Sequence, residues 1–586
     1  MTAATPDTLA SLAERYGPGY RWLVVFTCLM ASLGMVLASV SMNVAVPSVM
    51  GAFGVGQDQA QWIATGYLAT MVIGMLLNSW LVAAFGLRMT LMLLIAVFLA
   101  ASAIGAFSTS IEMLVLGRIL QGIPAGVIQP FCMMINFQIF PPERRGTAMG
   151  IFGMGVVLAP VFGPLLGGIA IDTLGWRYIF AMPLPFIVVA IVLGPIFLPE
   201  RPNKGPWPKF DWTGLALLAV SLVLVLTALT SGQRLGWSSD FVLGRGVLGF
   251  CSAFAFVWWE RRAPRPLLDF SLFRNPRFAC AMAVSFTFGV CMFSSSYVVP
   301  VFAQIIQGYS AMKAGWLLAM GGSVMIIMFP LSGRVSDTFP PHLLITSGLM
   351  VFSFGFFLIS WVDVNTGFMA MALLSAFTRI GLSWVLTPLN ATALRNVPAE
   401  KLANASSNAN FFRQLGGGMG IAILVAILET RTTFHANSLT ATQTPANATS
   451  GEALQVITNL LSTTGIPEVY RQFIATDFLG RVVFANANMF GFQDVFLTLA
   501  GLTLIAAIPA WFVRSPKPTF TLAATSPSVA VPKPEAEPEA TAKPRVPQMP
   551  PAPAVSAGRY LLHRRASHRN PARLPPLRSA SRRQTR

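Results

Sequence analysis

Three arginines lie inside long apolar stretches of the sequence, where charged side chains are rare. Arg118, Arg379 and Arg413 each stand about 10–18 Å from the nearer end of their stretch, at a helical rise of about 1.5 Å per residue. No Asp or Glu lies equally deep. A charge at the centre of a lipid bilayer costs at least ~2.5–3.5 kcal/mol. Each arginine is therefore expected to face a water-filled cavity or an internal partner.

Two roles are open for these arginines. One is structural, in which the guanidinium braces neighbouring helices through backbone carbonyls and nearby amides, Asn410 among them. The other is functional, because ionisable groups at membrane depth mark substrate or ion pathways. Without deep acids to balance them, the arginines would make an internal cavity electropositive and favour anions. The candidate substrate-contacting residues are Arg118, Gln121, Arg379, Arg413, Gln414 and Asn43.

Carboxylates that could carry a proton lie only near the ends of the apolar stretches. Asp494 and Asp172 are the candidates for proton coupling. The alternative for Asp494 is an aspartate at a helix N-terminus, where the helix dipole favours a negative charge. The sequence has no G-x-x-x-x-G-K-[ST] loop for nucleotide phosphates and no nucleophile–base set at membrane depth. With no C-x-x-C spacing and all four histidines outside the apolar stretches, we expect no enzyme activity, metal or cofactor.

The overall composition explains why these residues are embedded in apolar segments. Mean hydropathy is +0.64, and only 11% of the residues are charged, whereas a soluble domain carries about 25%. A helix needs about twenty residues to cross ~30 Å of hydrocarbon. We therefore predict an all-α polytopic membrane protein. The predicted spans are 21–44, 60–81, 89–108, 111–136, 146–171, 176–198, 211–231, 246–259, 278–305, 311–332, 342–361, 367–390, 403–428 and 489–512.

Basic residues are distributed unequally between the two sets of loops that join these spans. Among the short loops, one set carries fourteen Lys and Arg, and the other carries four. The positive-inside rule then places both termini in the cytoplasm of a cell whose inner (cytoplasmic) membrane holds the protein. The predicted regions are a cytoplasmic N-terminal segment (1–20), a six-helix bundle (21–200), two additional transmembrane helices (201–260), a cytoplasmic linker (261–277), a second six-helix bundle (278–512) with an external loop (429–488), and a cytoplasmic tail (513–586).

The tail holds much of the net charge of +18. Residues 515–586 contain thirteen Lys and Arg against three Glu. The segment is rich in Pro and Ala and lacks apolar periodicity, which predicts disorder. Beside a membrane, such a tail is better explained by contact with anionic lipid than by a nucleic-acid partner. In the external loop, Leu454, Ile457, Leu460 and Leu461 predict a short amphipathic helix outside the membrane.

The stretch 146–171 contains a small residue at every fourth position. Gly155, Ala159, Gly163 and Gly167 share one helix face, which allows another helix to approach closely. Prolines interleaved with them bend a membrane helix where its neighbours can satisfy the freed carbonyls. Tight packing alone accounts for the small face. The arrangement Gly155-x7-Gly163-Pro164-x-x-Gly167-Gly168 adds a second, functional interpretation.

This arrangement resembles the antiporter motif of the major facilitator superfamily, in which a bent fifth helix seals the bundle against proton leak. The resemblance covers residues 21–512 and extends to the fourteen-helix, EmrB-like drug:proton antiporter branch. It implies the major facilitator fold, with two six-helix bundles plus two additional linker helices (14 transmembrane helices). The other motifs that carry it are Gln61-Trp62 with Tyr67-Leu68, Arg118-x-x-Gln121-Gly122, Trp176-Arg177-x-x-Phe180, Pro266-Leu-Leu-Asp269-Phe-Ser-Leu-Phe273 and Arg413-Gln-Leu-Gly416.

Two departures from that branch concern proton coupling and gating. The branch has an acidic residue five positions before the run Asn43-Val-Ala-Val-Pro47, and this chain has Ala38 there. The first cytoplasmic motif of the family keeps only Leu81 and Gly86, whereas the second copy keeps its glycine and its charged residues. The resemblance implies a gating role for Gly155, Pro160, Gly163, Pro164, Gly167, Gly168, Gly333, Arg334 and Asp337.

The resemblance and the electropositive interior together predict a secondary active efflux transporter. Its expected substrates are amphipathic anionic or weakly acidic drugs and toxic compounds, exported by alternating access with proton coupling. Two alternatives stay open, namely a dedicated exporter of a lipid-like metabolite or siderophore, and an uncoupled transporter-derived sensor or scaffold. The branch also implies a periplasmic adaptor and an outer-membrane channel as partners, with the external loop 429–488 as the contact.

Overall fold

The computed structural model consists of long helices in the part of the chain that it describes. The described residues are 9–200, 208–264, 266–395, 397–444, 447–464 and 466–514, and they contain no strand. The chain divides into two units, 1–519 and 520–586. The predicted tail from residue 515 onward lies outside the described residues. So do the side chains of Asn43, Pro160, Pro164 and Asp172, although their backbone is helical.

The helices of the first unit are joined mainly by short loops. In chain order they are α1 (Leu9–Tyr16), α2 (Tyr20–Phe53), α3 (Gln57–Ala106), α4 (Ile111–Ile139), α5 (Arg145–Leu174), α6 (Leu184–Phe197), α7 (Trp212–Leu235), α8 (Asp240–Glu260), α9 (Pro276–Ile305), α10 (Ala311–Thr338), α11 (Pro341–Ile359), α12 (Phe368–Arg395), α13 (Leu402–Ala441), α14 (Ala448–Thr463) and α15 (Glu468–Phe512). Short 3₁₀ turns are η1 (Pro142–Arg144), η2 (Trp176–Phe180), η3 (Phe270–Arg274) and η4 (Ala399–Lys401).

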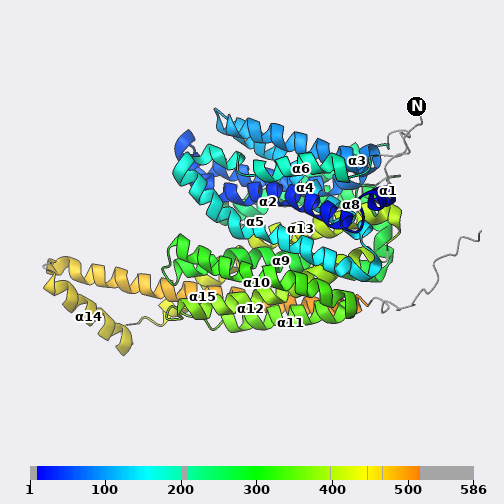
Figure 1. The fold of residues 1–586 in the computed structure, drawn as a ribbon. Helices are drawn as coiled ribbons and strands as arrows, with labels where there is room; N and C mark the ends of the chain where they lie inside the picture. Colours follow the sequence, from blue (N-terminus) through cyan, green and yellow to red (C-terminus); the bar gives the residue numbers. More distant parts are fainter. Residues whose placement is uncertain are drawn as a thin grey trace, which may run out of the picture. The chain divides into compact units, whose positions relative to one another are not determined.

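Helices α2 to α6 pack against one another, and helices α9 to α13 pack together with α15 (Figure 1). We call these sets the first and second bundle. In the first, α3 packs on α4, and α2 packs on α5 and α6; in the second, α9 packs on α13 and α11 packs on α12 and α15. Helices α7 and α8 pair with each other, and α7 also contacts α3 and α13. The bundles meet where α5 packs on α10 and where α13 packs on α3 and α4.

Twelve helical segments among the described residues are long and apolar enough to cross a membrane. Two predicted spans, 60–81 and 89–108, correspond to one of these segments, Trp62–Ala106. It has 45 residues and is far longer than the ~20 residues of a single crossing. Inside it, Gly86 has φ 77°, a left-handed conformation that only glycine adopts readily. The predicted span 146–171 corresponds to α5, which is not among the twelve. The count of fourteen therefore stays a prediction.

Local sequence signals explain several helix starts. Ser110 caps α4 by accepting the backbone N–H of Met113, and Ser310 caps α10 in the same way. Asn275 caps α9 and is followed by Pro276, whose fixed φ suits the first helical position. Prolines inside α4, α9, α10 and α12 are tolerated because neighbouring helices shield the freed carbonyl groups.

The predicted external loop 429–488 is mostly helical. Helix α13 continues to Ala441, and α15 begins at Glu468, about twenty residues before the predicted span. The predicted amphipathic helix exists as α14, capped by Asn447. We call 429–488 the arm; α14 packs against α15 and projects with it from one end of the bundles in Figure 1. Hydropathy marks only the part of a helix that lipid covers, so it does not reveal where a helix continues into water.

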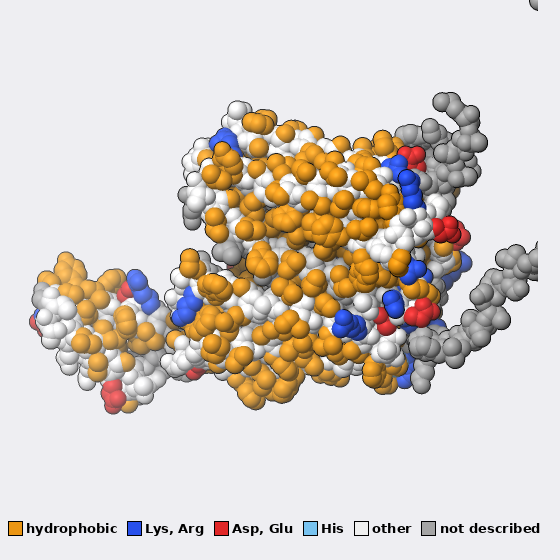
Figure 2. Space-filling model, viewed as in Figure 1, with side chains coloured by type: hydrophobic (Ala, Val, Ile, Leu, Met, Phe, Trp, Pro, Cys, Tyr) orange, Lys and Arg blue, Asp and Glu red, His pale blue; other side chains and the backbone are white. Residues whose placement is uncertain are grey.

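The surface of the first unit changes character along the helices. Figure 2 shows a broad hydrophobic face over the middle of the bundles, with Lys and Arg gathered mainly toward the end that carries α1. We call this the basic end, and the opposite end the α14 end. Exposed apolar side chains such as Phe254, Leu373 and Ile505 belong to helices long enough to cross a membrane. This distribution is what a multi-pass membrane protein requires, since lipid solvates its outer face.

Candidate functional site

Arg118 is held by contacts with three helices of the first bundle. Its Nη1 donates to Gln121 Oε1 at 3.0 Å and to the carbonyl oxygen of Ala38 at 3.3 Å, and its Nε donates to the carbonyl oxygen of Ile63 at 3.5 Å. The guanidinium carbon lies 4.0 Å from the centre of the Tyr67 ring. Arg118 is only 2% exposed. These acceptors offset the cost of burying the charge, so the structure favours the bracing role for Arg118.

Position 38 itself takes part in that network. The resembling branch has an acidic side chain there, whereas this chain presents the backbone carbonyl of Ala38 to Arg118. Gln121 extends the network by donating from Nε2 to Ser102 Oγ at 2.7 Å. Among the described residues, no carboxylate forms an ion pair with Arg118. The missing first-span acid is therefore replaced by neutral acceptors rather than by another carboxylate.

Arg413 connects the two bundles. From α13 its Nη2 donates to Gln129 Oε1 of α4 at 3.2 Å and also bonds Asn410 Oδ1 one turn earlier. Asn410 in turn donates from Nδ2 to Met133 Sδ of α4 at 3.3 Å. Both acceptors of Arg413 are neutral amides, so its positive charge is hydrogen-bonded but not neutralised. The neighbouring Gln414 is buried, at 7% exposed.

Arg379 differs from the other two deep arginines. It lies on α12, eleven residues after Phe368, and is 5% exposed. In the part of the chain that the structure describes, no hydrogen bond, ion pair or ring contact engages its guanidinium. The nearby Ser383 hydroxyl bonds the Arg379 carbonyl oxygen, at 2.9 Å, rather than the side chain. Of the candidate substrate residues, Asn43 alone has a side chain outside the described set.

The glycines of α5 that sequence analysis singled out face α2. A Cβ added at Gly163 would lie 3.2 Å from Val40 Cβ, and one at Gly167 would lie 3.2 Å from Ser41 Cβ. Ser41 Oγ donates to the Gly163 carbonyl oxygen at 3.2 Å. Gly155 is similarly covered by the Leu29 side chain, whereas nothing lies within 4 Å of a Cβ at Gly168. This face packs two helices within the first bundle, as the packing interpretation predicts.

Helix α13 uses glycine in the same way against α9. A Cβ at Gly416 would lie 2.1 Å from the Phe286 carbonyl oxygen, and one at Gly417 would lie 2.3 Å from the Phe293 ring. On the other helix, a Cβ at Gly289 would lie 1.9 Å from the Arg413 carbonyl oxygen. The backbones of α9 and α13 therefore touch directly at the depth of Arg413. The position of this arginine is fixed by backbone contact rather than by side-chain packing alone.

Asp337 joins the two bundles at the basic end. Its Oδ1 accepts the backbone N–H of Gly146 at 2.7 Å, and its Oδ2 accepts the N–H and the hydroxyl of Thr147 at 2.9 and 2.6 Å. The carboxylate of α10 thus caps the first turn of α5, where the helix dipole is positive. Hydrogen bonds to an ionised acceptor are stronger than neutral ones. We call this contact the latch.

The backbones of α5 and α10 touch beside the latch. A Cβ at Gly333 would lie 2.7 Å from the Gly146 carbonyl oxygen, and one at Gly150 would lie 2.5 Å from the Phe329 carbonyl oxygen. Only glycine permits this approach, so the latch is part of a fitted contact between bundles. The third residue of this motif, Arg334, is exposed. Sequence analysis identified Gly333 and Asp337 but not their partners Gly146 and Thr147.

The corresponding contact between α3 and α13 is weaker. Asn78 Nδ2 lies 3.4 Å from Ser407 Oγ and 3.5 Å from the Ala403 carbonyl oxygen, both on α13. The Asn78 Oδ1 atom is buried without a hydrogen-bond partner. The α3–α13 contact therefore uses a neutral amide, whereas the latch uses a carboxylate. Asn78 was not among the residues predicted from sequence; it lies one residue before the degraded first cytoplasmic motif.

Other polar side chains on helices that contact the opposite bundle are buried without partners. Among the described residues, the side-chain nitrogen and oxygen of Asn136 on α4 and of Asn408 on α13 have no hydrogen-bond partner. The hydroxyl of Ser336 on α10 also has none. Burying a polar group without a hydrogen bond costs about 1–3 kcal/mol in proteins. These groups would gain water if the bundles separated at this end. The closed arrangement is therefore less favourable than its apolar packing alone would make it.

Asp494 lies at the α14 end in an ion-pair cluster, not at a helix N-terminus. Its Oδ2 accepts from Arg431 Nε at 2.6 Å and contacts His435 Nε2 at 2.8 Å, both on α13. Helix α15 begins at Glu468, so the helix-dipole interpretation of Asp494 was wrong. Sequence analysis placed His435 in a loop, but it lies on the extension of α13. The side chain of the other proton candidate, Asp172, lies outside the described residues.

The linker between α8 and α9 is tied to the start of α13. Lys401 Nζ lies 2.8 Å from Asp269 Oδ2 and 2.6 Å from Ser271 Oγ. Burial raises the pKa of the Asp269 carboxyl, but hydrogen bonds from Lys401 and Ser271 outweigh it and hold this pKa below its usual value. Asp269 therefore stays ionised near neutral pH. This contact couples the 261–277 linker to the helix that carries Arg413.

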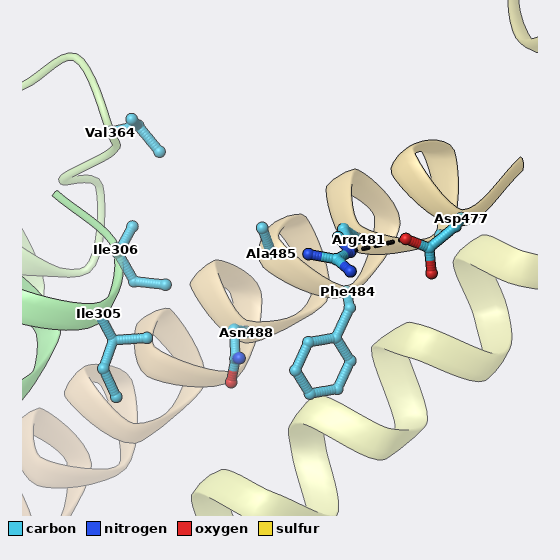
Figure 3. Close-up of a pocket in the computed structure, with 9 residues that line it drawn as sticks. Ile305, Ile306, Val364, Asp477, Arg481, Phe484, Ala485 and Asn488 are labelled. Carbon is cyan, nitrogen blue, oxygen red and sulfur yellow. Dashed lines mark hydrogen bonds and ion pairs between the residues drawn. The ribbon is translucent and has the colours of Figure 1, made fainter. Parts of the chain in front are cut away.

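A pocket at the α14 end lies apart from the deep arginines (Figure 3). In that view Ile305, at the end of α9, and Ile306, just after it, face the arm part of α15. On that part Asp477 and Arg481 form an ion pair of 2.9 Å. Phe484 lies on the same helix. None of the three deep arginines lines this pocket. It is a groove between the second bundle and the arm, separate from the residues that span the bundle contact.

Comparison with known proteins identifies the family of this architecture. The profile of the Major Facilitator Superfamily matches residues 25–421, which include all three deep arginines and the latch. The chain belongs to the major facilitator superfamily. It is a multi-pass membrane protein of a family of transporters, not enzymes. The helical fold and the latch between its halves agree with this membership.

The relatives of the chain include multidrug export proteins. It is 28% identical over 501 residues to the "Multidrug export protein EmrB" of Escherichia coli strain K12, covering 84% of this chain and 96% of the relative. It is 27% identical over 520 residues to the "Probable multidrug resistance protein EmrY" of the same strain, covering 88% and 98%. The chain is thus a major facilitator transporter related to these efflux proteins, which confirms the resemblance predicted from its motifs.

Solved structures support the fold. The human organic anion transporter MFSD10 (TETRAN) has a TM-score of 0.54 at 16% identity, covering 84% of this chain and all of that one. The proton:xylose symporter XylE has a TM-score of 0.55 at 13% identity, covering 84% and 96%. At these identities the likeness concerns the fold alone. The all-helical major facilitator fold is therefore confirmed.

Proposed function

We propose that this protein is a secondary active exporter of amphipathic anionic or weakly acidic compounds. The observation that carries this proposal is the charge of the interior. Arg379 and Arg413 lie deep in the second bundle, and no described carboxylate pairs with either of them. A membrane interior that holds uncompensated arginines attracts anions and disfavours permanent cations. Relationship to multidrug export proteins supports export as the direction of transport.

Alternating access between the two bundles is the proposed mechanism. The latch and the glycine contacts of α5 and α10 hold the bundles together at the basic end, and the buried amides of Asn136 on α4 and Asn408 on α13 have no hydrogen-bond partners among the described residues. Opening this end would break the charge-assisted bonds of Asp337 and hydrate those amides. These two contributions oppose each other, so the closed and open states can lie close in free energy. A transporter that must populate both states requires such a balance.

We further propose that the basic end faces the cytoplasm, with both termini inside the inner membrane, as the positive-inside rule predicts. The arm then lies on the external side. Its exposed apolar side chains, including Val469, Phe473 and Leu460, support a protein contact there. A periplasmic adaptor leading to an outer-membrane channel is the partner that we propose for this surface.

Proton coupling is the proposed energy source, carried by Asp494 at the α14 end. Ala38 removes the first-span carboxylate of the resembling branch, and Arg118 is satisfied by neutral groups. Asp494 with His435 is the described carboxylate–imidazole pair at an end that we place outside. An external-side proton site suits export, because protons enter as the compound leaves.

The experiment that tests the function compares cells with and without the protein. A panel of weak acids, neutral dyes and permanent cations is loaded, and the accumulation of each is measured. We expect lower accumulation of the weak acids and unchanged accumulation of the cations. Export of permanent cations as well as anions would contradict the electropositive interior. Unchanged accumulation of every compound, at confirmed membrane abundance, would favour the uncoupled sensor or scaffold.

A further inference from the structure

Two unpaired polar groups lie on one face of α12. Arg379 is 5% exposed, and within the described residues its guanidinium has no hydrogen-bond or ion-pair partner. Ser375 is 1% exposed, and its hydroxyl is buried without a hydrogen bond. Residues four apart share a helix face, so both groups project to the same side. The Arg379 guanidinium without a described protein acceptor and the buried Ser375 hydroxyl without a hydrogen bond are two neighbouring donors that a ligand can complete.

Both groups lie against the same point of the α10 backbone, at Gly321. A Cβ added at Gly321 would lie 3.0 Å from Arg379 Cγ, 3.6 Å from Arg379 Nε and 3.6 Å from Ser375 Oγ. Because Gly321 has no side chain, the Arg379 and Ser375 side chains both fit against it, and their polar atoms converge on one place. We call this place the Gly321 contact. It lies about 17 Å along α12 from Phe368, at about 1.5 Å per residue, and so near the middle of the helix.

The environment of other groups on the same helix makes this pair distinct. Thr378 Oγ1 donates to the Ser375 carbonyl oxygen at 2.7 Å, and Ser383 Oγ donates to the Arg379 carbonyl oxygen at 2.9 Å. Both hydroxyls are thus satisfied by their own helix. The two other deep arginines also have acceptors, as described above. Arg379 and Ser375 alone among these groups keep their side-chain donors unused.

We infer that Arg379 and Ser375 form the subsite that binds the carboxylate of the exported weak acid. A guanidinium presents parallel N–H donors that match the two oxygens of a carboxylate. The serine hydroxyl supplies a third donor to the same group. This assignment rests on the proposed function, and it selects one of the three arginines as the ligand-binding one. Arg118 then acts as a brace, and Arg413 as a contact between the bundles.

The test uses the purified full-length protein in lipid nanodiscs and a matched pair of probes. The probes are 4-hexylbenzoate and its neutral isostere 4-hexylbenzamide, with binding measured by isothermal titration calorimetry. We expect the wild type to prefer the carboxylate. Arg379→Gln should weaken carboxylate binding by about tenfold or more, because hydrogen bonds to a charged group are lost, and leave amide binding nearly unchanged.

Further variants separate the subsite from general packing. Ser375→Ala should weaken carboxylate binding severalfold, whereas Ser383→Ala, whose hydroxyl bonds its own helix, should not change it. Gly321→Ala adds a methyl group 3.0 Å from Arg379 Cγ, which should displace the guanidinium and weaken carboxylate binding while keeping both donors. Arg379→Lys keeps the positive charge and serves as a control for loss of folding. It should bind the carboxylate with intermediate affinity, because an ammonium lacks the paired donors of a guanidinium.

The outcomes distinguish this inference from the proposed function. If the wild type prefers the carboxylate and Arg379→Gln does not alter that preference, the subsite is wrong and the function stands. Equal losses of carboxylate and amide binding in Arg379→Gln would also overturn the subsite. If the wild type binds the amide as well as the carboxylate, or binds neither, both the substrate class and the subsite are wrong.

Discussion

Arg118, Arg379 and Arg413 share a residue type and a depth but not an environment. Arg118 has neutral acceptors on three helices, Arg413 reaches across to the other bundle, and Arg379 has no described acceptor. From sequence, all three were candidates both for bracing and for substrate contact. Hydrogen-bond satisfaction separates these roles, and it depends on tertiary contacts such as the Ala38 carbonyl that no local pattern encodes.

The first prediction concerns the bracing arginine. Arg118→Gln removes three hydrogen bonds and a cation–π contact, which we expect to lower stability by roughly 2–4 kcal/mol in all. Thermal unfolding in detergent should therefore occur at a clearly lower temperature than in the wild type. The matched control is Arg379→Gln, which removes an unpartnered buried charge and should not lower that temperature. Equal unfolding temperatures for the wild type and Arg118→Gln would contradict the bracing role.

The second prediction concerns Asp494. An imposed pH gradient should drive export in membrane vesicles carrying the wild type and should fail to do so in Asp494→Asn, because the amide cannot take up a proton. Binding of the exported compound should remain in the variant. Asp477→Asn is a matched control. Asp477 lies on α15 like Asp494 and also pairs with an arginine, but it is exposed on the arm.

Asp172→Asn completes this comparison, since Asp172 is the other acid that sequence analysis selected. If the gradient drives export equally in the wild type and both variants, neither carboxylate couples transport to protons. Loss in Asp172→Asn alone would move the coupling site to α5.

At the scale of elements, α5 and α10 form the closest contact between the bundles. Glycines remove side chains from the contact, and the Asp337 carboxylate then reaches the backbone N–H groups of another helix. The strength of this contact comes from the combination, because a carboxylate can cap a helix only when that helix approaches closely. The sequence motif around Gly333 and Asp337 is therefore one half of a contact whose other half is the start of α5.

The third prediction tests the latch. Asp337→Asn replaces charge-assisted hydrogen bonds by weaker ones, a loss of about 1.5–3 kcal/mol, and should shift the bundles toward opening at the basic end by roughly tenfold or more. The measurement is the labelling rate of a cysteine at Ser332, a buried position on α10, by a membrane-impermeant maleimide in inverted vesicles. Labelling should be faster in the variant.

A carboxylate at the other end provides the control for this experiment. Asp363 is hydrogen-bonded within its own loop, to Thr366, so Asp363→Asn should leave labelling at Ser332 unchanged. Equal labelling rates in Asp337→Asn and the wild type would mean that the glycine contacts close this end without the carboxylate.

The sequence predicts the apolar segments well, but it does not predict how far the helices continue beyond them. Each predicted span overlaps a helix, because an apolar run of this length has little choice in a membrane; the span 176–198 also includes the 3₁₀ turn η2 and a break before α6. The prediction erred where helices continue beyond lipid. Helix α13 runs on past Glu429 because nothing in the following residues breaks it, and the same is true of α15 before Met489. Hydropathy does not predict either extension.

The sequence predicted the key residues of the candidate site but not the residues with which they form hydrogen bonds. The deep arginines, Asp337 and Asp494 were all identified by type and position. Their partners were not, because Thr147, Gln129 and His435 carry no signal that distinguishes them from other polar residues. Pairing across nearly two hundred positions, as between Thr147 and Asp337, follows only from the packing of the two bundles.

The two halves of the whole molecule are alike in architecture but unequal in charge. Glycines pack α5 on α2 in the first half and α13 on α9 in the second. By contrast, the α5–α10 contact has a carboxylate, while the α3–α13 contact has the neutral Asn78. Separation of the bundles should therefore begin on the α3–α13 side, where fewer and longer hydrogen bonds must break.

The fourth prediction concerns the membrane topology on which this inequality depends. If α3 crosses twice around Gly86, then Arg88 and Ser108 lie on opposite sides of the membrane, and the basic end is cytoplasmic. Alkaline phosphatase, which is active only outside the cytoplasm, should be active when fused after Ser108, Gly175 or Gln443. It should be inactive when fused after Arg88, Arg144, Glu200 or Glu260, and green fluorescent protein should give the reverse pattern.

Each pair of neighbouring fusions tests one crossing. The change between Arg88 and Ser108 tests the second half of α3, and the change between Arg144 and Gly175 tests α5, the two places where the count of fourteen spans depends on more than helix length. The Gln443 fusion tests the arm, which must be external if it is to meet an adaptor. Activity after Arg88, or its absence after Gln443, would overturn the topology and with it the cytoplasmic location of the latch.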